Sequence, residues 1–253
     1  MDEYPKPVTK ECTKKILEQM NNMNNLIYGI YDKNIEQLGT CFFCLIKYNN
    51  LKIPVMIASY QKLIKYLLNN CKGVDILINN ELFFIEFGNA KYINNNYDLL
   101  IIQIKENKDI HINYLIIDDD IYEKELETYF YKESIYIINY NNINDISVSY
   151  GLINYINNSE IIYSGYKNFI SETSLIFHLN NNKLIGFNPR NSKYYNKGIF
   201  LKFFINEFIN IYQYSNINKN ALNEIDLYMR IIPEEINKDI YFLNKSNLNN
   251  NLK

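Results

Sequence analysis

The sequence predicts a mainly β protein, built as a barrel or a sandwich, and three observations carry that prediction. Short apolar runs rich in Ile, Tyr and Phe follow one another from residue 26 onward, separated by Asn, Gly and Asp. Helical patterns are confined to a few segments and do not alternate with the strands, as they would in βαβ units. Hydrophobic residues make up 47% of the chain, which is enough for a sizeable core and excludes a disordered chain.

The first predicted element is a short amphipathic helix over Pro7–Asn22. Its apolar residues recur at helical spacing, and Thr9 or Thr13 is a candidate cap. These apolar residues are Ile16, Leu17, Met20 and Met23. Strands are expected at Leu26–Tyr31, Thr40–Tyr48, Ile53–Ser59, Asp75–Ile78, Glu81–Phe87, Leu99–Lys105, Tyr114–Ile117, Ser134–Tyr140, Ile146–Ile156, Ile161–Tyr166, Leu175–Leu179 and Lys183–Phe187. Further helices are expected at Tyr60–Leu68, Phe200–Ile211 and Lys219–Ile231, followed by a polar tail over Asn244–Lys253.

The charge balance restricts the partners that the chain can have. The 26 Lys and Arg residues face 28 Asp and Glu residues, which gives a formal net charge of −2. Nucleic acid or an anionic membrane would need clustered positive charge, so the sequence predicts neither as a partner. Only two basic residues are arginines, Arg190 and Arg230, which leaves few groups for bidentate phosphate contacts. No run approaches the roughly 20 apolar residues of a transmembrane helix.

Composition also bears on location and origin. Met1–Lys10 is polar and charged, unlike a signal peptide, so the expected location is the cytoplasm. The chain contains 43 Asn and 42 Ile but three Ala, a bias toward amino acids with A/T-rich codons. This bias points to a very A/T-rich genome, such as that of a protist or a large DNA virus. In a virus, the host cytoplasm or the virion would be the location.

Two short motifs invite a metal interpretation, and we expect neither to bind one. Cys41 and Cys44 are spaced as in a metal-binding pair, but they lie in a predicted strand, where residues three apart point to opposite faces. They are therefore predicted to be buried apolar residues. The run Asp118–Asp120 lacks the Gly and the spaced Glu of a calcium loop and is predicted to be a solvated loop. The sequence thus predicts no metal and no cofactor.

Several segments follow one another in an order that carries a family resemblance. They are Lys6–Val8 with Lys14–Met20, Gly39–Cys44, Ile53–Leu63, Tyr97–Ile104, Glu133–Ile137 with Ile146–Gly151, and Lys197–Lys202. As a set they resemble the trypsin-like, chymotrypsin-fold serine peptidase domains of low-GC protists, bacteria and giant viruses. The resemblance implies two β-barrels with a cleft between them. The expected division is a helical leader at 1–25, barrels at 26–110 and 111–210, and a helical extension with a polar tail at 211–253.

The chemistry of that family needs a Ser nucleophile, a His base, an Asp that orients the His, and main-chain donors for the oxyanion. The resemblance places Asp98 on the acid and Ser174 on the nucleophile, and we expect both to converge with residue 61. The position of the base is occupied by Gln61, and an amide cannot take up a proton at any relevant pH. Ile170 and Thr173 stand where the family has loop glycines, and β-branched residues resist positive φ.

The chain is therefore predicted to be a catalytically inactive protease homologue that acts as a binding or structural module for a protein or peptide partner. The alternative is an active hydrolase, a peptidase or phosphodiesterase, whose base has moved to His178, Tyr60, Lys62 or Lys65. A viral structural or host-interaction protein is a third possibility, which rests on composition alone. The sequence does not define an oligomeric state.

Overall fold

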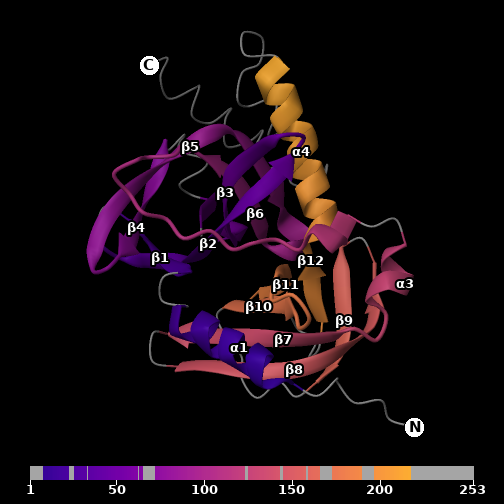
Figure 1. Ribbon diagram of the computed structural model, residues 1–253. Coiled ribbons are helices and arrows are strands. Elements are labelled where there is room, and N and C mark those ends of the chain that lie inside the picture. Colours follow the sequence, from indigo (N-terminus) through magenta and orange to yellow (C-terminus); the bar gives the residue numbers. More distant parts are fainter. Residues whose placement is uncertain are drawn as a thin grey trace, which may run out of the picture.

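Two closed β-barrels of six strands each form the body of the molecule (Figure 1). The computed structural model describes residues 8–22, 26–32, 34–61, 63–64, 72–122, 125–142, 145–157, 159–165, 173–189 and 197–217. The architecture agrees with the fold that the family resemblance implies, a mainly β chymotrypsin-like fold with a helix near each end.

The first barrel closes in the order β1-β2-β3-β6-β5-β4. Its strands are β1 (Ile27–Tyr31), β2 (Gln37–Tyr48), β3 (Leu51–Ser59), β4 (Gly73–Ile78), β5 (Glu81–Asn94) and β6 (Leu99–Ile104). Strand β5 is longer than predicted because a register shift between Phe87 and Lys91 lets it pair first with β4 and then with β6. One bent strand thus closes two sides of the barrel.

The second barrel closes in the order β10-β11-β12-β9-β8-β7. Its strands are β7 (Ser134–Asn142), β8 (Asp145–Ile156), β9 (Glu160–Gly165), β10 (Thr173–His178), β11 (Leu184–Pro189) and β12 (Lys197–Phe200). Strand β12 was not predicted as a strand. It is four residues long and runs directly into a helix, and the predicted helix began at its last residue, Phe200.

The segment between the barrels is hydrogen-bonded to both of them. It contains a 3₁₀ helix, η3 (Asp119–Tyr122), and a short α-helix, α3 (Leu126–Phe130). The strand predicted at Tyr114–Ile117 is instead a pair of isolated bridges, Cys44 with Leu115 in the first barrel and Ile117 with Leu184 in the second. The main-chain nitrogen of Leu115 donates to the oxygen of Phe43 at 2.8 Å.

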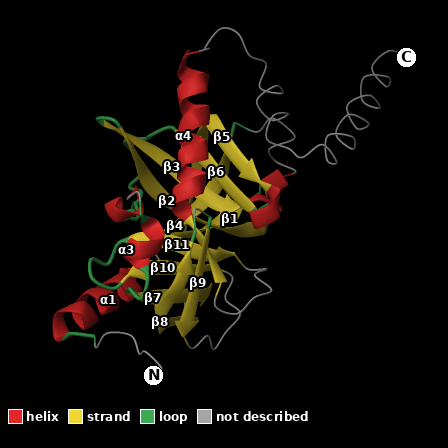
Figure 2. Cartoon of the chain, turned by 90° about the vertical axis from the view of Figure 1, so that its right-hand side faces the viewer, coloured by secondary structure: helices red, strands yellow, loops and turns green. Residues whose placement is uncertain are grey.

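Helix α1 (Lys10–Asn22) lies against strands β7 and β8 of the second barrel (Figures 1 and 2). Ile16 is its buried residue, and Gln19 donates from Nε2 to the main-chain oxygen of Asn182 at 3.0 Å. The phenol of Tyr136 donates to Oε1 of Gln19. The N-terminal helix is thus fixed to the barrel that is farther from it in the sequence.

Helix α4 (Leu201–Ile217) leaves the second barrel and packs on the first, beside β5 (Figure 2). The ring of Phe204 is fully buried and meets the rings of Tyr92 and Tyr97 at centroid distances of 6.3 and 5.1 Å. Near the far end of α4, Gln213 donates to the phenol oxygen of Tyr48 at 2.7 Å. The predicted helix at Lys219–Ile231 and the polar tail lie outside the described residues.

One hydrophobic cluster extends through both barrels. Phe42 of β2 and Phe187 of β11 meet edge to face at 5.5 Å across the junction. Cys44 belongs to this shared cluster, whereas Cys41 belongs to a second cluster inside the first barrel. The two thiols therefore point to opposite faces of β2, as predicted, and burial raises the pKa of both. None of the helices among the described residues has the length and apolarity that a membrane crossing requires.

Replacing Phe204 with Ala tests whether α4 holds the barrels together. We expect Phe204→Ala to lower the free energy of unfolding by roughly 3–5 kcal/mol, the usual cost of truncating a buried Phe. The matched control is Phe203→Ala, because the neighbouring ring is 37% exposed and should cost about 1 kcal/mol. Urea unfolding followed by circular dichroism measures both. Equal losses in the two variants would contradict the packing role of α4.

Candidate functional site

Asp98 lies where a short 3₁₀ turn, η2 (Asn95–Tyr97), meets β6. Its backbone is left-handed, with φ 49° and ψ 42°, a conformation that Asp tolerates better than most residues. The side chain of Asn94 stabilises the turn by accepting from the main-chain nitrogen of Tyr97. This local geometry places the half-buried carboxylate of Asp98 beside the end of β3.

The carboxylate of Asp98 binds the first residues of the helical turn that follows β3. Its Oδ2 accepts from the hydroxyl of Ser59 at 2.6 Å, and its Oδ1 accepts from the main-chain nitrogen of Gln61 at 2.7 Å. The main-chain nitrogen of Tyr60 donates to the main-chain oxygen of Asp98 at 3.2 Å. Asp98 therefore acts as an N-cap supplied by another strand. The structure brings Asp98 and Gln61 together.

The contacts of Asp98 with the described residues involve a hydroxyl and main-chain groups, and none of them is with a basic side chain. The side chain of Gln61 is exposed and carries an amide, which cannot accept a proton near neutral pH. The bond between Gln61 and Asp98 uses the main chain, so it would form with almost any residue at position 61. Ser59 contributes to this site and was not singled out from the sequence. Its place immediately before a predicted helix was the available signal.

Ser174 lies inside the wall of the second barrel, away from solvent. It is the second residue of β10, is 1% exposed, and donates from Oγ to Oδ1 of Asn139 at 2.9 Å. Its register partners are Asn139 on β7 and Asn188 on β11. The structure thus does not bring this hydroxyl to a surface that a substrate could reach. The sequence frame placed Ser174 in a loop, whereas the strand already begins at Thr173.

The polar residues around Ser174 form hydrogen bonds with one another inside the barrel. The amide nitrogen of Asn139 donates to the hydroxyls of Ser147 and Ser149, and that of Asn188 donates to the phenol of Tyr163 at 2.8 Å. Such bonds offset the cost of burying polar groups. Ile170 and the rest of the segment before β10, where the oxyanion loop is expected, lie outside the described residues.

The alternative bases have different positions. Lys62 and Lys65 lie outside the described residues. Tyr60 is buried, and burial raises the pKa of its phenol, which disfavours the deprotonated form that a base requires. His178 is 3% exposed, and carboxylate oxygens lie within 3.4 Å of each ring nitrogen. It lies on β10 of the second barrel, and its described contacts go to neither Asp98 nor Gln61.

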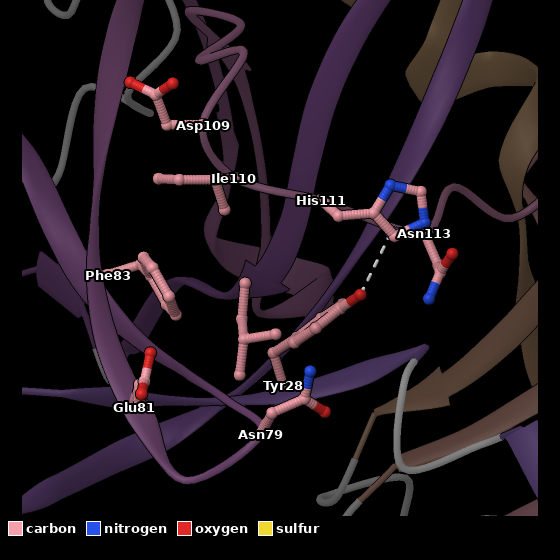
Figure 3. Close-up of a pocket in the computed structure, with 9 residues that line it drawn as sticks. Tyr28, Asn79, Glu81, Phe83, Asp109, Ile110, His111 and Asn113 are labelled. Carbon is pink, nitrogen blue, oxygen red and sulfur yellow. Dashed lines mark hydrogen bonds between the residues drawn. The ribbon is translucent and has the colours of Figure 1, made fainter.

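A pocket of about 330 Å³ lies at the first barrel, between β1, the β4–β5 hairpin and the inter-barrel segment (Figure 3). The rings of Tyr28 and Phe83 lie on opposite sides of it, and the phenol of Tyr28 accepts from the main-chain nitrogen of Asn113. Among the described residues, its lining includes the carboxylates of Glu81 and Asp109 and no Lys or Arg. The remaining lining residues are Ile78, Asn79, Ile110 and His111.

Removing the carboxylate of Asp98 tests its role as a cap. We expect Asp98→Ala to cost about 2 kcal/mol of unfolding free energy, because a charged cap and two hydrogen bonds are lost. Asp98→Asn should cost less, since Asn keeps one acceptor oxygen and tolerates the left-handed backbone. Asp109→Ala, at an exposed carboxylate, is the control. If Asp98→Ala and Asp109→Ala have the same stability in urea, the capping role is wrong.

Comparison with known proteins gives a structural likeness and no sequence relative. No protein-family profile and no curated protein sequence matches the chain. The crystal structure of Deg5, an HtrA/trypsin-like serine protease, superimposes with a TM-score of 0.51 and 11% sequence identity. The match covers 79% of this chain and 95% of the Deg5 chain. The likeness supports the topology described above: the chain has the chymotrypsin-like two-barrel fold.

Proposed function

We propose that the chain is a catalytically inactive trypsin-like protease homologue that binds a protein or peptide partner. The observation that carries the proposal is the contact between Asp98 and Gln61. The carboxylate of Asp98 accepts a hydrogen bond from the main chain of Gln61. The side chain of Gln61 is an amide, whereas the reaction of a serine protease needs a base at this position. Loss of the base in serine proteases typically costs about 10⁴–10⁶ in rate.

The position of Ser174 supports the same proposal. Its hydroxyl is buried and donates to Asn139, whereas a nucleophile must face the substrate and pass its proton to a base. Asp98 has a structural role that does not depend on catalysis, because it caps the helical turn after β3. Retention of the acid is therefore consistent with loss of the reaction.

The pocket on the first barrel supports a binding role and suggests the chemistry of the partner. Its two carboxylates, Glu81 and Asp109, and its two rings, Tyr28 and Phe83, favour an ammonium or guanidinium group through charge and cation–π contacts. The partner that fits is a peptide segment with a Lys or Arg side chain. Cys12, Cys41 and Cys44 are free thiols, which is compatible with a reducing cytoplasm as the location.

Activity-based labelling tests the inactive state. We expect no reaction with a fluorophosphonate probe and no cleavage of a peptide library above the heat-denatured sample, because an unactivated hydroxyl keeps its proton. Gln61→His should remain inactive as well, since Ser174 stays buried in β10. Trypsin is the positive control. Stoichiometric labelling of any serine, abolished by its substitution with Ala, would favour the alternative of an active hydrolase with a relocated base.

Peptide binding tests the second half of the proposal. Peptides selected on the purified chain from a random display library should be enriched in Lys or Arg and should be recovered uncut. The double variant Glu81→Gln, Asp109→Asn should weaken their binding by about tenfold or more, since each charged contact is worth roughly 1 kcal/mol. The charge-matched control is the double variant Glu11→Gln, Glu18→Gln, because both side chains are exposed on α1 and lie outside the pocket. Unchanged affinity in the pocket variant would remove this site from the proposal.

A further inference from the structure

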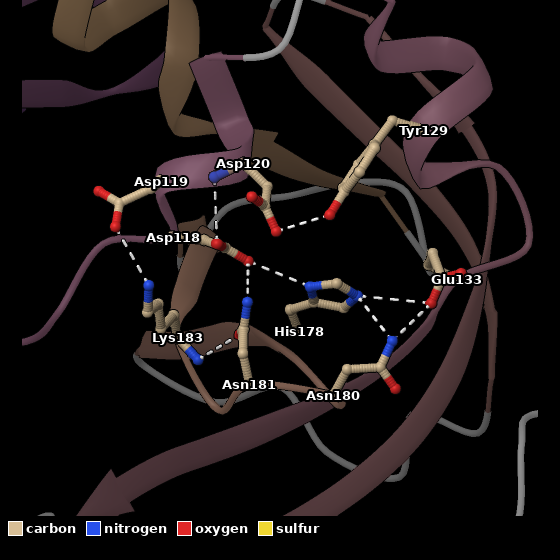
Figure 4. A network of polar contacts seen from close by, with 9 residues as sticks. All are labelled: Asp118, Asp119, Asp120, Tyr129, Glu133, His178, Asn180, Asn181 and Lys183. Atoms are coloured by element: carbon tan, nitrogen blue, oxygen red, sulfur yellow. Dashed lines mark hydrogen bonds and ion pairs between the residues drawn. The ribbon is translucent and has the colours of Figure 1, made fainter.

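A network of ionisable groups lies on the second barrel (Figure 4). It contains neither Asp98, Gln61 nor Ser174, the three residues that the family resemblance places in the catalytic set. The imidazole of His178 lies between two carboxylates, with Nδ1 3.1 Å from Oδ2 of Asp118 and Nε2 3.4 Å from Oε2 of Glu133. The side chains of His178 and Asp118 are 4% and 1% exposed, and that of Glu133 is 22% exposed. Asp118 was predicted to lie in a solvated loop, and the structure shows it buried.

The geometry favours the protonated imidazole. A neutral imidazole has one N–H and one lone pair, so with carboxylates at both nitrogens its lone pair would face a negative charge. An imidazolium donates to both. Asn180 Nδ2 also lies 3.4 Å from Nε2, but its shorter contact, 2.9 Å, goes to Glu133.

The hydrogen bonds around Asp118 favour its ionised form. Besides His178, its carboxylate accepts from the side chain of Asn181 at 2.8 Å and from the main-chain nitrogen of Asp120 at 3.2 Å. A carboxylate that accepts three hydrogen bonds is stabilised in the charged state. The extra proton of the network therefore belongs on the imidazole and not on Asp118.

The network is attached to the segment that connects the barrels. The main-chain nitrogen of Asp118 donates to the oxygen of Leu184 at 2.9 Å, one residue after the bridge between Ile117 and Leu184. Three residues earlier, Leu115 is bonded to the first barrel. The same segment is therefore tied to the first barrel at Leu115 and to the second barrel at Asp118.

Asp119 adds a second, exposed tie between the barrels. Its carboxylate accepts from Lys47 of β2 at 2.7 Å and from Lys183, in the turn between β10 and β11, at 3.2 Å. These ion pairs are exposed and contribute little individually, because water and salt screen them. The buried contact between His178 and Asp118 is less screened and is the stronger tie.

We propose that His178 is a proton-dependent clip that fastens the inter-barrel segment to the second barrel. In the protonated form, His178 joins β10 to Asp118 on one side and to Glu133 at the start of β7 on the other. Loss of the proton leaves the imidazole with one donor for two carboxylates, so one of them faces a lone pair and Asp118 no longer faces a positive charge. The segment is then held less tightly, and with it the attachment of the first barrel to the second. The clip does not depend on what the chain binds.

The pH range of the clip follows from the signs of the pKa shifts. Burial lowers the pKa of His178, but the hydrogen bonds and charges of Asp118 and Glu133 outweigh burial and hold the pKa above its usual value. The stabilisation is therefore complete below the ordinary value of about 6.5 and is lost as the pH rises through the folded-state pKa. For Asp118, burial alone would raise the pKa, but the hydrogen bonds that its carboxylate accepts outweigh burial and lower the pKa. The contribution of Asp118 to stability is therefore lost only as the pH falls through this lowered pKa.

Among the residues that the structure describes, the other ionisable groups around the network are Asp119, Asp120, Lys183 and Tyr129. The phenol of Tyr129 donates to Oδ2 of Asp120 at 2.6 Å, and this bond helps to raise the pKa of Tyr129 to about 12, well above the range of the clip. Atoms of Asp118, Asp120 and His178 lie within 4.8 Å of one another, as in a metal site. However, the oxygens of Asp118 and Oδ2 of Asp120 already accept hydrogen bonds, so a proton accounts for the geometry without displacing any donor.

Nuclear magnetic resonance of the imidazole nitrogens tests the proposal directly, with the exposed His111 as an internal control. We expect the imidazole of His178 to titrate above the ordinary histidine value of about 6.5 and to be doubly protonated below that value. Glu133→Gln should lower the proton affinity of His178 by about tenfold, because one facing charge is removed. A His178 imidazole that titrates at or below about 6.5 would overturn the proposal.

Hydrogen exchange tests the attachment of the segment. Above the pKa of His178, the protection factors of the Asp118 and Leu184 amides should fall at least about tenfold, while those of β3 stay unchanged. In His178→Gln the pH dependence should disappear, and in His111→Gln it should remain. If His178→Gln does not fold, Glu133→Gln should move the midpoint of this loss to lower pH. Constant protection across the titration, or Zn²⁺-dependent stabilisation that His178→Gln abolishes, would overturn the clip, the latter in favour of a metal site.

Discussion

The short segment from Leu115 to Asp118 is the constraint on which the relation between the barrels depends. It is hydrogen-bonded to β2 at one end and to β11 at the other, and it runs beside the apolar cluster that both barrels share. Burial of that cluster supplies most of the attraction, but apolar contacts have no preferred direction. The main-chain bonds and the carboxylate of Asp118 fix how the barrels are oriented relative to each other. Helix α4, which leaves the second barrel and packs on the first, adds a further attachment.

Asp98 has a structural role that does not depend on catalysis. In this chain its carboxylate binds Ser59 and the main chain of Gln61, and so it holds the turn after β3 in place. Because the bond to residue 61 uses the main chain, it does not depend on which side chain stands at that position. Stability alone can therefore account for an Asp at position 98, and its presence says little about activity. The identity of residue 61 and the exposure of the hydroxyl are the informative features.

The sequence predicted the elements that local patterns specify. Alternating apolar residues and Asn-rich turns located most strands, and the spacing of Cys41 and Cys44 correctly placed them on opposite faces. What it missed depends on contacts between distant residues. Asp118 is followed by two more acidic residues and reads as solvated, yet its partner His178 is 60 residues away on β10. Likewise, the first residue of β10 decides whether Ser174 is in a loop or inside a barrel wall, and no local signal marks it.

The distribution of histidine links the two parts of the structure. Histidine is the side chain whose ordinary pKa lies closest to neutral pH, and neither of the two histidines in the chain is at position 61. The thiols of Cys41 and Cys44 are buried, and burial raises their pKa. His111 is exposed, whereas His178 is enclosed by carboxylates. The two carboxylates couple the protonation of His178 to the structure. The imidazole of His178 thus lies at the joint between the barrels, where a change in its charge acts on the attachment of one barrel to the other.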